Sequence, residues 1–482
     1  MAAATSVLPA VALKRRVRIV PLELGDVTFH DLADRFAGEP EFALLDSRTN
    51  DGGLGQFSLF SFAPFAKLTS KNGVSRVSEH GSTRVEMGVF PSLDRMLSQY
   101  QVEAEHNAAG LPFLGGAIGY FSYELGRQIE KLPNSTDDQL GLPDCYLSFY
   151  NFAVVQCHAD NRLYFCHFDA TAHPTAAKAD DVLAKLGSAK RGAYRRGLRG
   201  PKAVAGNHRQ FQTDFTKDEY CAAIARIRDY IRAGDVYQVN MTQRIQASVA
   251  DVPPWRLYQC LMEVNPAPFA AYLNCEGHAI VSSSPERFLL VRGQYVETRP
   301  IKGTIRRGAT PREDYAKGQE LLRSGKNRAE LAMIVDLMRN DLGRVCTPGS
   351  VRVKAFPELE TYSSVHHLVA TIQGERRRDR TLTDLIRATF PGGSITGAPK
   401  IRAMEIIDEL EPVARGVYTG SIGYLGFNGS ADLNIAIRTI IVKDGIAYVH
   451  AGGGIVAESE EVDEYEEALL KGRRLVDAIN AV

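Results

Sequence analysis

Short apolar runs separated by turn residues dominate the first third of the chain. Between Val17 and Phe168, runs rich in β-branched and aromatic residues alternate with clusters of Gly, Pro and Asn, a pattern typical of strands. The expected strands span residues 42–46, 58–63, 115–123, 152–157 and 163–168. This part is therefore predicted to be rich in β-sheet.

After residue 212, apolar residues begin to recur at the spacing of a helix. Thr216 and Glu219 form a capping box, apolar residues follow at helical spacing, and Gly234 provides a stop, so a helix is predicted over 217–233. Further helices are expected at 313–323, 328–341, 382–390, 399–410 and 461–479, and further strands at 236–246, 279–282, 288–291, 295–298, 421–427, 431–442 and 446–451. Hairpins and helices mix without strict βαβ alternation. The predicted fold class is therefore α+β, with mixed, largely antiparallel sheets packed as a sandwich and helices on the outside.

Composition divides this chain of 482 residues into segments. Between Ala170 and Gln212 it shifts to Ala, Gly, Lys and Arg, which is typical of a solvated linker. The predicted organisation is a disordered lead-in over residues 1–16, an N-terminal domain over 17–170, a linker over 171–212 and a catalytic domain over 213–482.

Charge and cysteine content exclude several classes of partner. The 57 basic residues balance 57 acidic ones, so no overall attraction to nucleic acid or to an anionic membrane is expected. The weakly apolar stretch over residues 7–13 is too short to span a bilayer. Seven scattered cysteines without a Cys-x-x-Cys pair argue against a disulfide framework and against structural zinc, and they favour a reducing cytoplasm.

Glu286 and Lys302 are the strongest candidates for chemistry. The strands predicted between them, with Gly293 near the turn, would bring the two side chains face to face. A lysine between Ile301 and Gly303 loses some solvation, which lowers its pKa and frees part of it as a nucleophile or base. Glu286 would then supply a proton to a leaving group. The alternative is an ordinary salt bridge at the surface.

Three carboxylates from two predicted helices form a candidate magnesium site. Glu464, Glu467 and Lys471 recur at spacings of three and four and so share one helix face. Glu330 lies on another predicted helix, and hard oxygen ligands of this kind suit Mg²⁺ shared with an anionic substrate. The alternative is a solvated salt bridge between Glu467 and Lys471.

Two glycine-rich segments and an arginine are candidates for binding an anion. Residues 391–400 run from a turn into a helix, and such a turn points free backbone amides at a ligand. A second glycine turn is expected at 451–455, after a strand. Arg438 has apolar neighbours on a predicted strand, so it needs an acidic partner if it points inward, and the alternative is an outward-facing side chain. His367 is either a catalytic helper or a hydrogen-bonded core residue.

Together these motifs resemble the chorismate-utilising enzymes, a family that includes anthranilate, aminodeoxychorismate, isochorismate and salicylate synthases. The matching segments run from Gly234 to Lys471, and the N-terminal part is similar more loosely, around residues 45–47 and 115–120. The resemblance implies chorismate as the substrate and Mg²⁺ as the cofactor, held by Glu330, Glu464 and Glu467. It implies that Glu286 protonates the departing 4-hydroxyl. The substrate-binding positions are Arg438, Gly303, Thr304, Thr396, Gly397, Gly453, Gly454 and Lys471.

Two positions bear on which reaction of the family is expected. The synthases that add water resemble one another in having a lysine base where this chain has Gln238, so water addition is disfavoured. Lys302 is similar to the lysine of lysine-type aminodeoxychorismate synthases, whereas anthranilate synthases usually carry alanine there. The resemblance therefore implies amination at C4 of chorismate, towards p-aminobenzoate and folate. The alternatives are anthranilate synthase component I activity and a catalytically inactive ligand-binding protein of the same fold.

The resemblance also implies two partners. No cysteine lies in the Gly-x-Cys-x-Gly setting of a glutaminase nucleophile, so ammonia is expected from a separate glutamine amidotransferase subunit. In this group the N-terminal domain often binds tryptophan, here through residues near Ser47 and Pro266. The alternative for these residues is a packed interface between two sheets.

Overall fold

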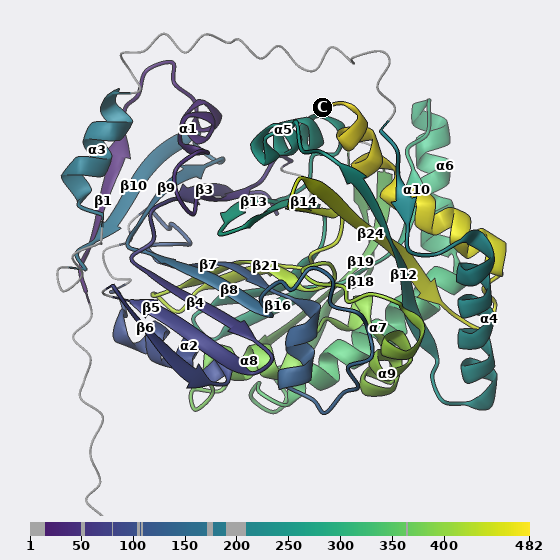
Figure 1. Cartoon of the computed structure of the whole chain (residues 1–482). Helices are drawn as coiled ribbons and strands as arrows, with labels where there is room; N and C mark the ends of the chain where they lie inside the picture. Colours follow the sequence, from purple (N-terminus) through teal and green to yellow (C-terminus); the bar gives the residue numbers. More distant parts are fainter. Residues whose placement is uncertain are drawn as a thin grey trace, which may run out of the picture.

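The chain folds into two large antiparallel sheets that lie one above the other, with helices on the outside (Figure 1). The computed structural model describes residues 15–49, 54–79, 81–103, 107, 109–170, 177–188, 209–362 and 365–482. The α+β sandwich predicted from the sequence is confirmed. Most of the predicted lead-in and much of the predicted linker lie outside the described residues.

The first sheet has twelve strands. In spatial order they are β1 (Val17–Leu22), β10 (Arg162–Phe168), β9 (Phe152–Cys157), β3 (Phe57–Ser61), β2 (Ala43–Asp46), β13 (Phe269–Cys275), β14 (His278–Ser284), β23 (Thr439–Lys443), β24 (Ile446–Ile455), β12 (Gln238–Ser248) and β11 (Gln212–Thr213), and the short β20 (Gly397–Ala398) pairs with β12.

The second sheet also has twelve strands. They are β17 (Ile301–Arg306), β19 (Val365–Glu375), β16 (Tyr295–Arg299), β15 (Arg287–Arg292), β22 (Ala431–Asn434), β21 (Ser421–Gly426), β7 (Gly116–Phe121), β8 (Cys145–Tyr150), β4 (Ala66–Lys71), β5 (Val74–Glu79) and β6 (Ser82–Met87), and β18 (Arg352–Thr361) pairs with β19. A large apolar cluster draws its side chains from both sheets.

The helices cover the outer faces of the two sheets. The helices α4 (Lys217–Ala233), α5 (Pro254–Val264) and α10 (Glu461–Asn480) pack on the first sheet, and α2 (Val89–Gln99), α6 (Pro311–Arg323) and α7 (Gly325–Gly343) pack on the second, while α8 (Leu382–Thr389) packs against α2 and α7. The remaining helices are α1 (Phe29–Phe36), α3 (Ala179–Ser188), which falls within the predicted linker, and α9 (Lys400–Leu410). Among the described residues, no helix is long and apolar enough to cross a membrane.

Both sheets contain strands from the N-terminal and the C-terminal parts of the chain. In the first sheet β2 pairs with β13, and in the second β7 pairs with β21. The division into domains at residues 170 and 213 stays a prediction. What the pairing establishes is that backbone hydrogen bonds join the two parts in each layer.

Two strand predictions near the C-terminus were wrong. The apolar run 431–442 was expected to form one strand, but it forms β22 in one sheet and β23 in the other, and residues 435–438 cross between them. The glycine run 451–455 was expected to be a turn, yet it completes β24. Its three glycines pair with Asn240, Met241 and Thr242 of β12, and their lack of side chains permits this close approach of the backbones.

Candidate active site

Two neighbouring crossovers between the sheets place Glu286 and Arg438. Glu286 lies between β14 of the first sheet and β15 of the second, and Arg438 lies between β22 and β23. The crossovers are joined by backbone hydrogen bonds, from Ile435 N–H to the Glu286 carbonyl at 3.0 Å and from Ser283 N–H to the Arg438 carbonyl at 3.0 Å. Sequence positions about 150 residues apart are thereby held side by side.

Glu286 and Lys302 meet through a third residue, Ser394. The Ser394 hydroxyl donates a hydrogen bond to Glu286 Oε1 at 2.5 Å, and Lys302 Nζ donates to the Ser394 carbonyl at 3.2 Å. Burial raises the pKa of Glu286 to about 7, although the hydrogen bond from Ser394 and the charge of Lys302 act in the opposite direction. The structure therefore brings the predicted pair together, with a carboxyl group that can still hold a proton near neutral pH.

The backbone of β17 presents Lys302 at the edge of the second sheet. Lys302 pairs with Leu368 and Thr304 with His367, and the register shifts between them at Gly303. Gly303 has φ of 78°, and a side chain there would meet Asn327 of α7 at 2.9 Å, so glycine is required. Desolvation lowers the pKa of the Lys302 amine, which the nearby carboxylates only partly oppose. A larger fraction of this amine is neutral than for a lysine in water.

The glycines of β24 allow polar and charged side chains to lie directly against the strand. A first side-chain carbon at Gly454 would lie 2.2 Å from Gln238 Nε2 and 3.5 Å from Lys302 Nζ. At Gly453 it would lie 3.3 Å from both Glu464 Oε2 and Lys471 Nζ. The predicted substrate positions Gly453 and Gly454 thus adjoin both the lysine and the acidic groups.

The acidic residues fit the hard oxygen ligands that Mg²⁺ prefers. Glu464 is buried and is fixed by the Ser459 hydroxyl at 2.6 Å, and burial together with the charge of Glu467 raises the pKa of Glu464. Burial opposes ionisation of Glu467 too, but Lys471 at 2.7 Å holds the pKa of Glu467 below its usual value. The charge of Glu330 acts on Lys302. Among the described residues, no group of three or more His, Cys, Asp or Glu side chains lies close enough together to hold a metal ion, so binding of Mg²⁺ by Glu330, Glu464 and Glu467 stays a prediction.

Arg438 and His367 are near enough to interact electrostatically. Burial lowers the pKa of His367 to about 3, and the charge of Arg438 adds to this effect, so the imidazole is neutral. His367 Nδ1 shares a 2.8 Å hydrogen bond with the Thr304 hydroxyl. Arg438 has φ of 50°, a strained value for a residue other than glycine. Within the described part of the chain, no hydrogen bond or ion pair of its guanidinium is present, and binding of an anion by Arg438 stays a prediction.

The segment after α8 supplies the predicted residues Thr396 and Gly397. Thr396 is fully buried, and its hydroxyl donates to the Gly392 carbonyl at 3.1 Å. Gly397, in β20, has φ of 147° and packs so closely on β12 that a side chain would meet the Gln238 carbonyl at 2.1 Å. These contacts fix the backbone of the loop that carries Ser394.

Sequence reasoning missed two residues that the structure adds to the site. Ser394 lay inside a segment interpreted only as an anion-binding turn, and its contacts are with residues more than 90 positions away. Tyr418 acts electrostatically on Arg438, and its ring stacks on His450 at 5.2 Å. Neither residue belongs to a spacing pattern that could have singled it out.

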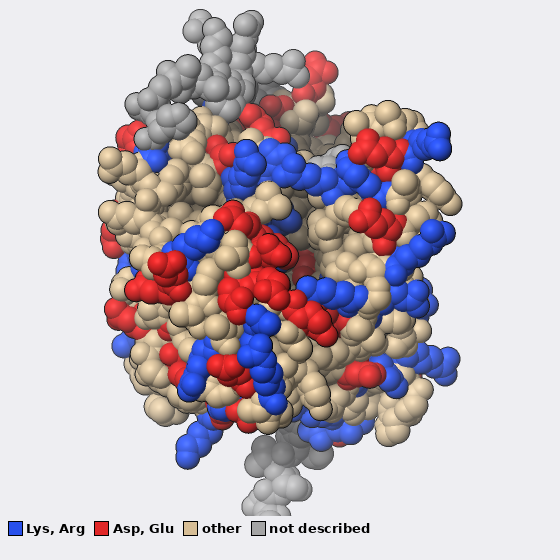
Figure 2. All heavy atoms as spheres, turned by 90° about the vertical axis from the view of Figure 1, so that its right-hand side faces the viewer, with Lys and Arg blue, Asp and Glu red and all other residues tan. Residues whose placement is uncertain are grey.

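Acidic side chains gather on the face that carries α4 and α10. Figure 2 shows Asp and Glu residues beside a hollow in the middle of this face, with Lys and Arg around its rim. The first turn of α10 contains the acidic residues Glu461 and Asp463 and the buried Glu464.

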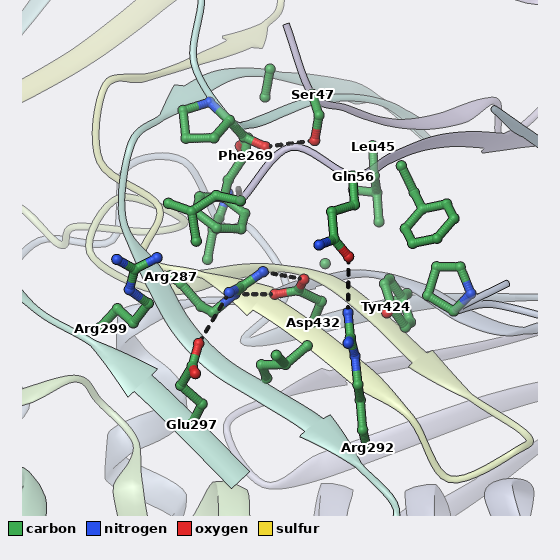
Figure 3. A pocket seen from close by; sticks show the side chains of 18 of the residues that line it. Leu45, Ser47, Gln56, Phe269, Arg287, Arg292, Glu297, Arg299, Tyr424 and Asp432 are labelled. Carbon is green, nitrogen blue, oxygen red and sulfur yellow. Dashed lines mark hydrogen bonds and ion pairs between the residues drawn. The ribbon is translucent and has the colours of Figure 1, made fainter. Parts of the chain in front are cut away.

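A separate cavity of about 850 Å³ lies between the sheets, and its lining contains neither Glu286 nor Lys302. Ser47 and Gln56 face it from the first sheet's side, and Arg287, Arg292 and Asp432 face it from the second (Figure 3). The predicted tryptophan residue Ser47 lines this cavity and donates to the Pro268 carbonyl at 2.8 Å. Pro266 is not part of the lining, and binding of tryptophan stays a prediction.

The fold and the arrangement of the site define an enzyme that acts on chorismate. The model of the chorismate binding enzyme family matches residues 42–477, and the chain belongs to this family. It is 39% identical over 445 residues to aminodeoxychorismate synthase component 1 of Escherichia coli (strain K12), covering 92% of this chain and 94% of the relative. It is also 39% identical over 447 residues to anthranilate synthase component 1 of Acetivibrio thermocellus, covering 90% and 89%.

A solved structure agrees with this assignment. Anthranilate synthase component I from Streptococcus pneumoniae TIGR4 matches with a TM-score of 0.76 and 31% identity, over 87% of this chain and 92% of that one. The chain is thus similar to both kinds of synthase to about the same degree. Choosing between the two reactions requires the residues of the site.

Proposed function

We propose that the protein is the chorismate-converting component of an aminodeoxychorismate synthase, which replaces the 4-hydroxyl of chorismate by an amino group. The placement of the Lys302 amine next to the buried Glu286 carboxyl carries this proposal. Burial shifts the pKa of the lysine downward and that of the glutamate upward, so both shifts favour the forms that a nucleophile and an acid need. Gln238, where the water-adding synthases have a lysine base, argues against hydration.

The reaction would proceed in two substitutions. Lys302 Nζ forms a bond to C2 of chorismate, the ring double bonds shift, and the C4–O bond breaks. Glu286 protonates the departing hydroxyl, which leaves as water. Ammonia then forms a bond to C4, the double bonds shift back, and the C2–Nζ bond breaks. The net change is exchange of ammonia for water, which gives 4-amino-4-deoxychorismate, a precursor of p-aminobenzoate and folate.

The other residues of the site would bind and orient the substrate. Glu330, Glu464 and Glu467 would hold Mg²⁺, which when bound neutralises negative charge on the substrate. Arg438 would take a remaining carboxylate, and the backbone of Gly453 and Gly454 would lie against the ring. Ammonia would come from a glutamine amidotransferase subunit that associates with this chain.

A synthase of the anthranilate type is the second candidate, since such relatives match equally well. The identity of the product distinguishes this candidate from an aminodeoxychorismate synthase. The purified protein would be incubated with chorismate, Mg²⁺ and ammonium, and the product identified by mass spectrometry and by the fluorescence of anthranilate. We expect 4-amino-4-deoxychorismate, whereas anthranilate as the product would refute the proposal. Unconsumed chorismate would favour an inactive binding protein.

Lys302→Ala tests the covalent step. We expect this variant to lose at least 100-fold in rate, on the order of the contribution of a positioned nucleophile, and to keep its unfolding midpoint. With chorismate and Mg²⁺ but no ammonia, the wild-type protein should accumulate an adduct on Lys302, detectable by peptide mass spectrometry. A variant that forms product at the wild-type rate would show that Lys302 is not the nucleophile.

A further inference from the structure

Ser394 contacts both members of the Glu286–Lys302 pair with different atoms. It lies in a short 3₁₀ turn, Gly393–Ile395, and only 4% of its surface is exposed. Its hydroxyl donates to Glu286 Oε1, and its carbonyl accepts from Lys302 Nζ. A buried serine in a turn commonly bonds to nearby backbone, as Thr396 does in the same loop. Ser394 instead reaches a carboxyl group 108 positions away.

The loop around Ser394 is held from several sides. Asn240 N–H donates to the Thr396 carbonyl at 2.8 Å, and the guanidinium of the buried Arg415 donates to the Ile395 carbonyl at 3.1 Å. Gly393 packs on Leu337 of α7, where a side chain would come within 2.6 Å. The Ser394 hydroxyl is therefore presented to Glu286 by a fixed backbone.

We infer that Ser394 is a positioning residue that orients the Glu286 carboxyl group and sets the pH at which this group gives up its proton. The inference rests on the proposed role of Glu286 as an acid. The hydroxyl fixes Oε1, and a backbone hydrogen bond from Ile301 also acts on the carboxyl group, so the orientation of this group is set by the chain around it. The hydrogen bond from the Ser394 hydroxyl favours the ionised carboxylate, so it offsets part of the effect of burial. The Ser394 carbonyl, held by the same turn, keeps the Lys302 amine next to the acid.

Removal of the hydroxyl should change the titration of Glu286 in a definite direction. In Ser394→Ala the carboxylate loses a hydrogen-bond donor, so the pKa of Glu286 should rise by roughly one unit, the size expected for one hydrogen bond to a charged group. Ser394→Thr keeps the hydroxyl and should titrate like the wild-type protein. The carboxyl C=O stretch in infrared spectra against pH reports this directly, and its loss in Glu286→Gln assigns the band.

Activity provides a second measurement. We expect Ser394→Ala to consume chorismate roughly 10-fold to 100-fold more slowly at neutral pH, the range for a displaced catalytic group, and Ser394→Thr to recover most of the rate. Ser61→Ala is the matched control: it also removes a buried serine hydroxyl, bonded to the Phe152 carbonyl at 2.8 Å in β3, far from Glu286 in the sequence. This control should leave the infrared titration unchanged.

Two outcomes would overturn the inference: an unchanged titration in Ser394→Ala, or an equal shift in Ser61→Ala. The titration is measured without substrate, and the rate is measured as loss of chorismate whatever the product. If anthranilate were formed, the proposed function would fail while the role of Ser394 could still be upheld. If the product were 4-amino-4-deoxychorismate and the titration did not move, only the inference about Ser394 would fail.

Discussion

At the scale of single residues, the chemistry depends on moving two pKa values towards one another. In water, glutamate is ionised and lysine is protonated at neutral pH, so neither could act as proposed. Desolvation acts on both, because it disfavours each charged form: it raises the pKa of Glu286 to about 7 and lowers that of Lys302. Glu286 is 3% exposed, so water does not restore its charge.

The raised pKa of Glu286 also makes the stability of the protein depend on pH. Between 4.5, the ordinary value, and about 7, the folded protein keeps a proton that the unfolded chain releases. The free energy of unfolding therefore falls as pH rises through this range, by up to about 3 kcal/mol. We expect Glu286→Gln to match the wild-type protein near pH 5 and to be the more stable of the two near pH 8, as measured by urea denaturation.

The exposed Glu263 provides the control for that experiment. Glu263→Gln makes the same chemical change in solvent, and we expect its stability relative to wild type to be the same near pH 5 and near pH 8. If Glu286→Gln behaved in the same way as this control, the carboxyl group of Glu286 would have an ordinary pKa in the folded protein.

At the scale of elements, the sequence predicted what local pattern determines and missed what depends on partners. The helix 217–233 was confirmed as α4 because its capping box and glycine stop are local signals. The run 431–442 looked like one strand, since apolar alternation carries no information about which sheet a strand joins. The crossover inside it is what places Arg438 beside the Glu286 segment, so the error concerned the part of the run that builds the site.

The glycine run of β24 was also interpreted as a turn, because glycine is a frequent turn residue and its pairing partners in β12 lie 210 to 214 residues earlier. The candidate residues themselves were found by residue type and motif. The sequence did not show that Ser394 joins Glu286 and Lys302, because contacts between distant segments leave no local pattern.

Gly453 tests the role of the β24 backbone. In Gly453→Ala the added methyl group would press against Glu464 and Lys471, so these side chains must shift. We expect the Mg²⁺ concentration needed for half-maximal activity to rise by roughly tenfold, as for changes that displace metal ligands, with little change in the unfolding midpoint. Calorimetric titration of Mg²⁺ in the presence of chorismate measures the affinity directly.

Gly187→Ala is the matched control, because a methyl group there meets no atom within 4 Å. It should leave the Mg²⁺ requirement as it is. An unaltered Mg²⁺ affinity in Gly453→Ala would show that the β24 backbone at this position does not affect binding of the cation.

At the scale of the whole molecule, the site is built where the two layers meet. Lys302 comes from the edge of the second sheet, Gly453 and Gly454 come from the first, and Glu286 lies on a chain segment that joins them. The relative position of the sheets therefore sets the distance between the nucleophile and the substrate-binding backbone. Both sheets extend into the N-terminal part of the chain through the β2–β13 and β7–β21 pairs.

This shared architecture predicts that the C-terminal part cannot work alone. A fragment of residues 209–482 would expose β13 and β21 as open strand edges and would uncover apolar side chains of the shared core. We expect it to aggregate when expressed by itself. Co-expression with residues 1–188 should give a soluble complex that unfolds in one transition and consumes chorismate, as followed by calorimetry and by chorismate absorbance. A fragment that is monomeric and active alone would show instead that the catalytic part is an independent domain, despite the backbone pairing that joins it to the N-terminal strands.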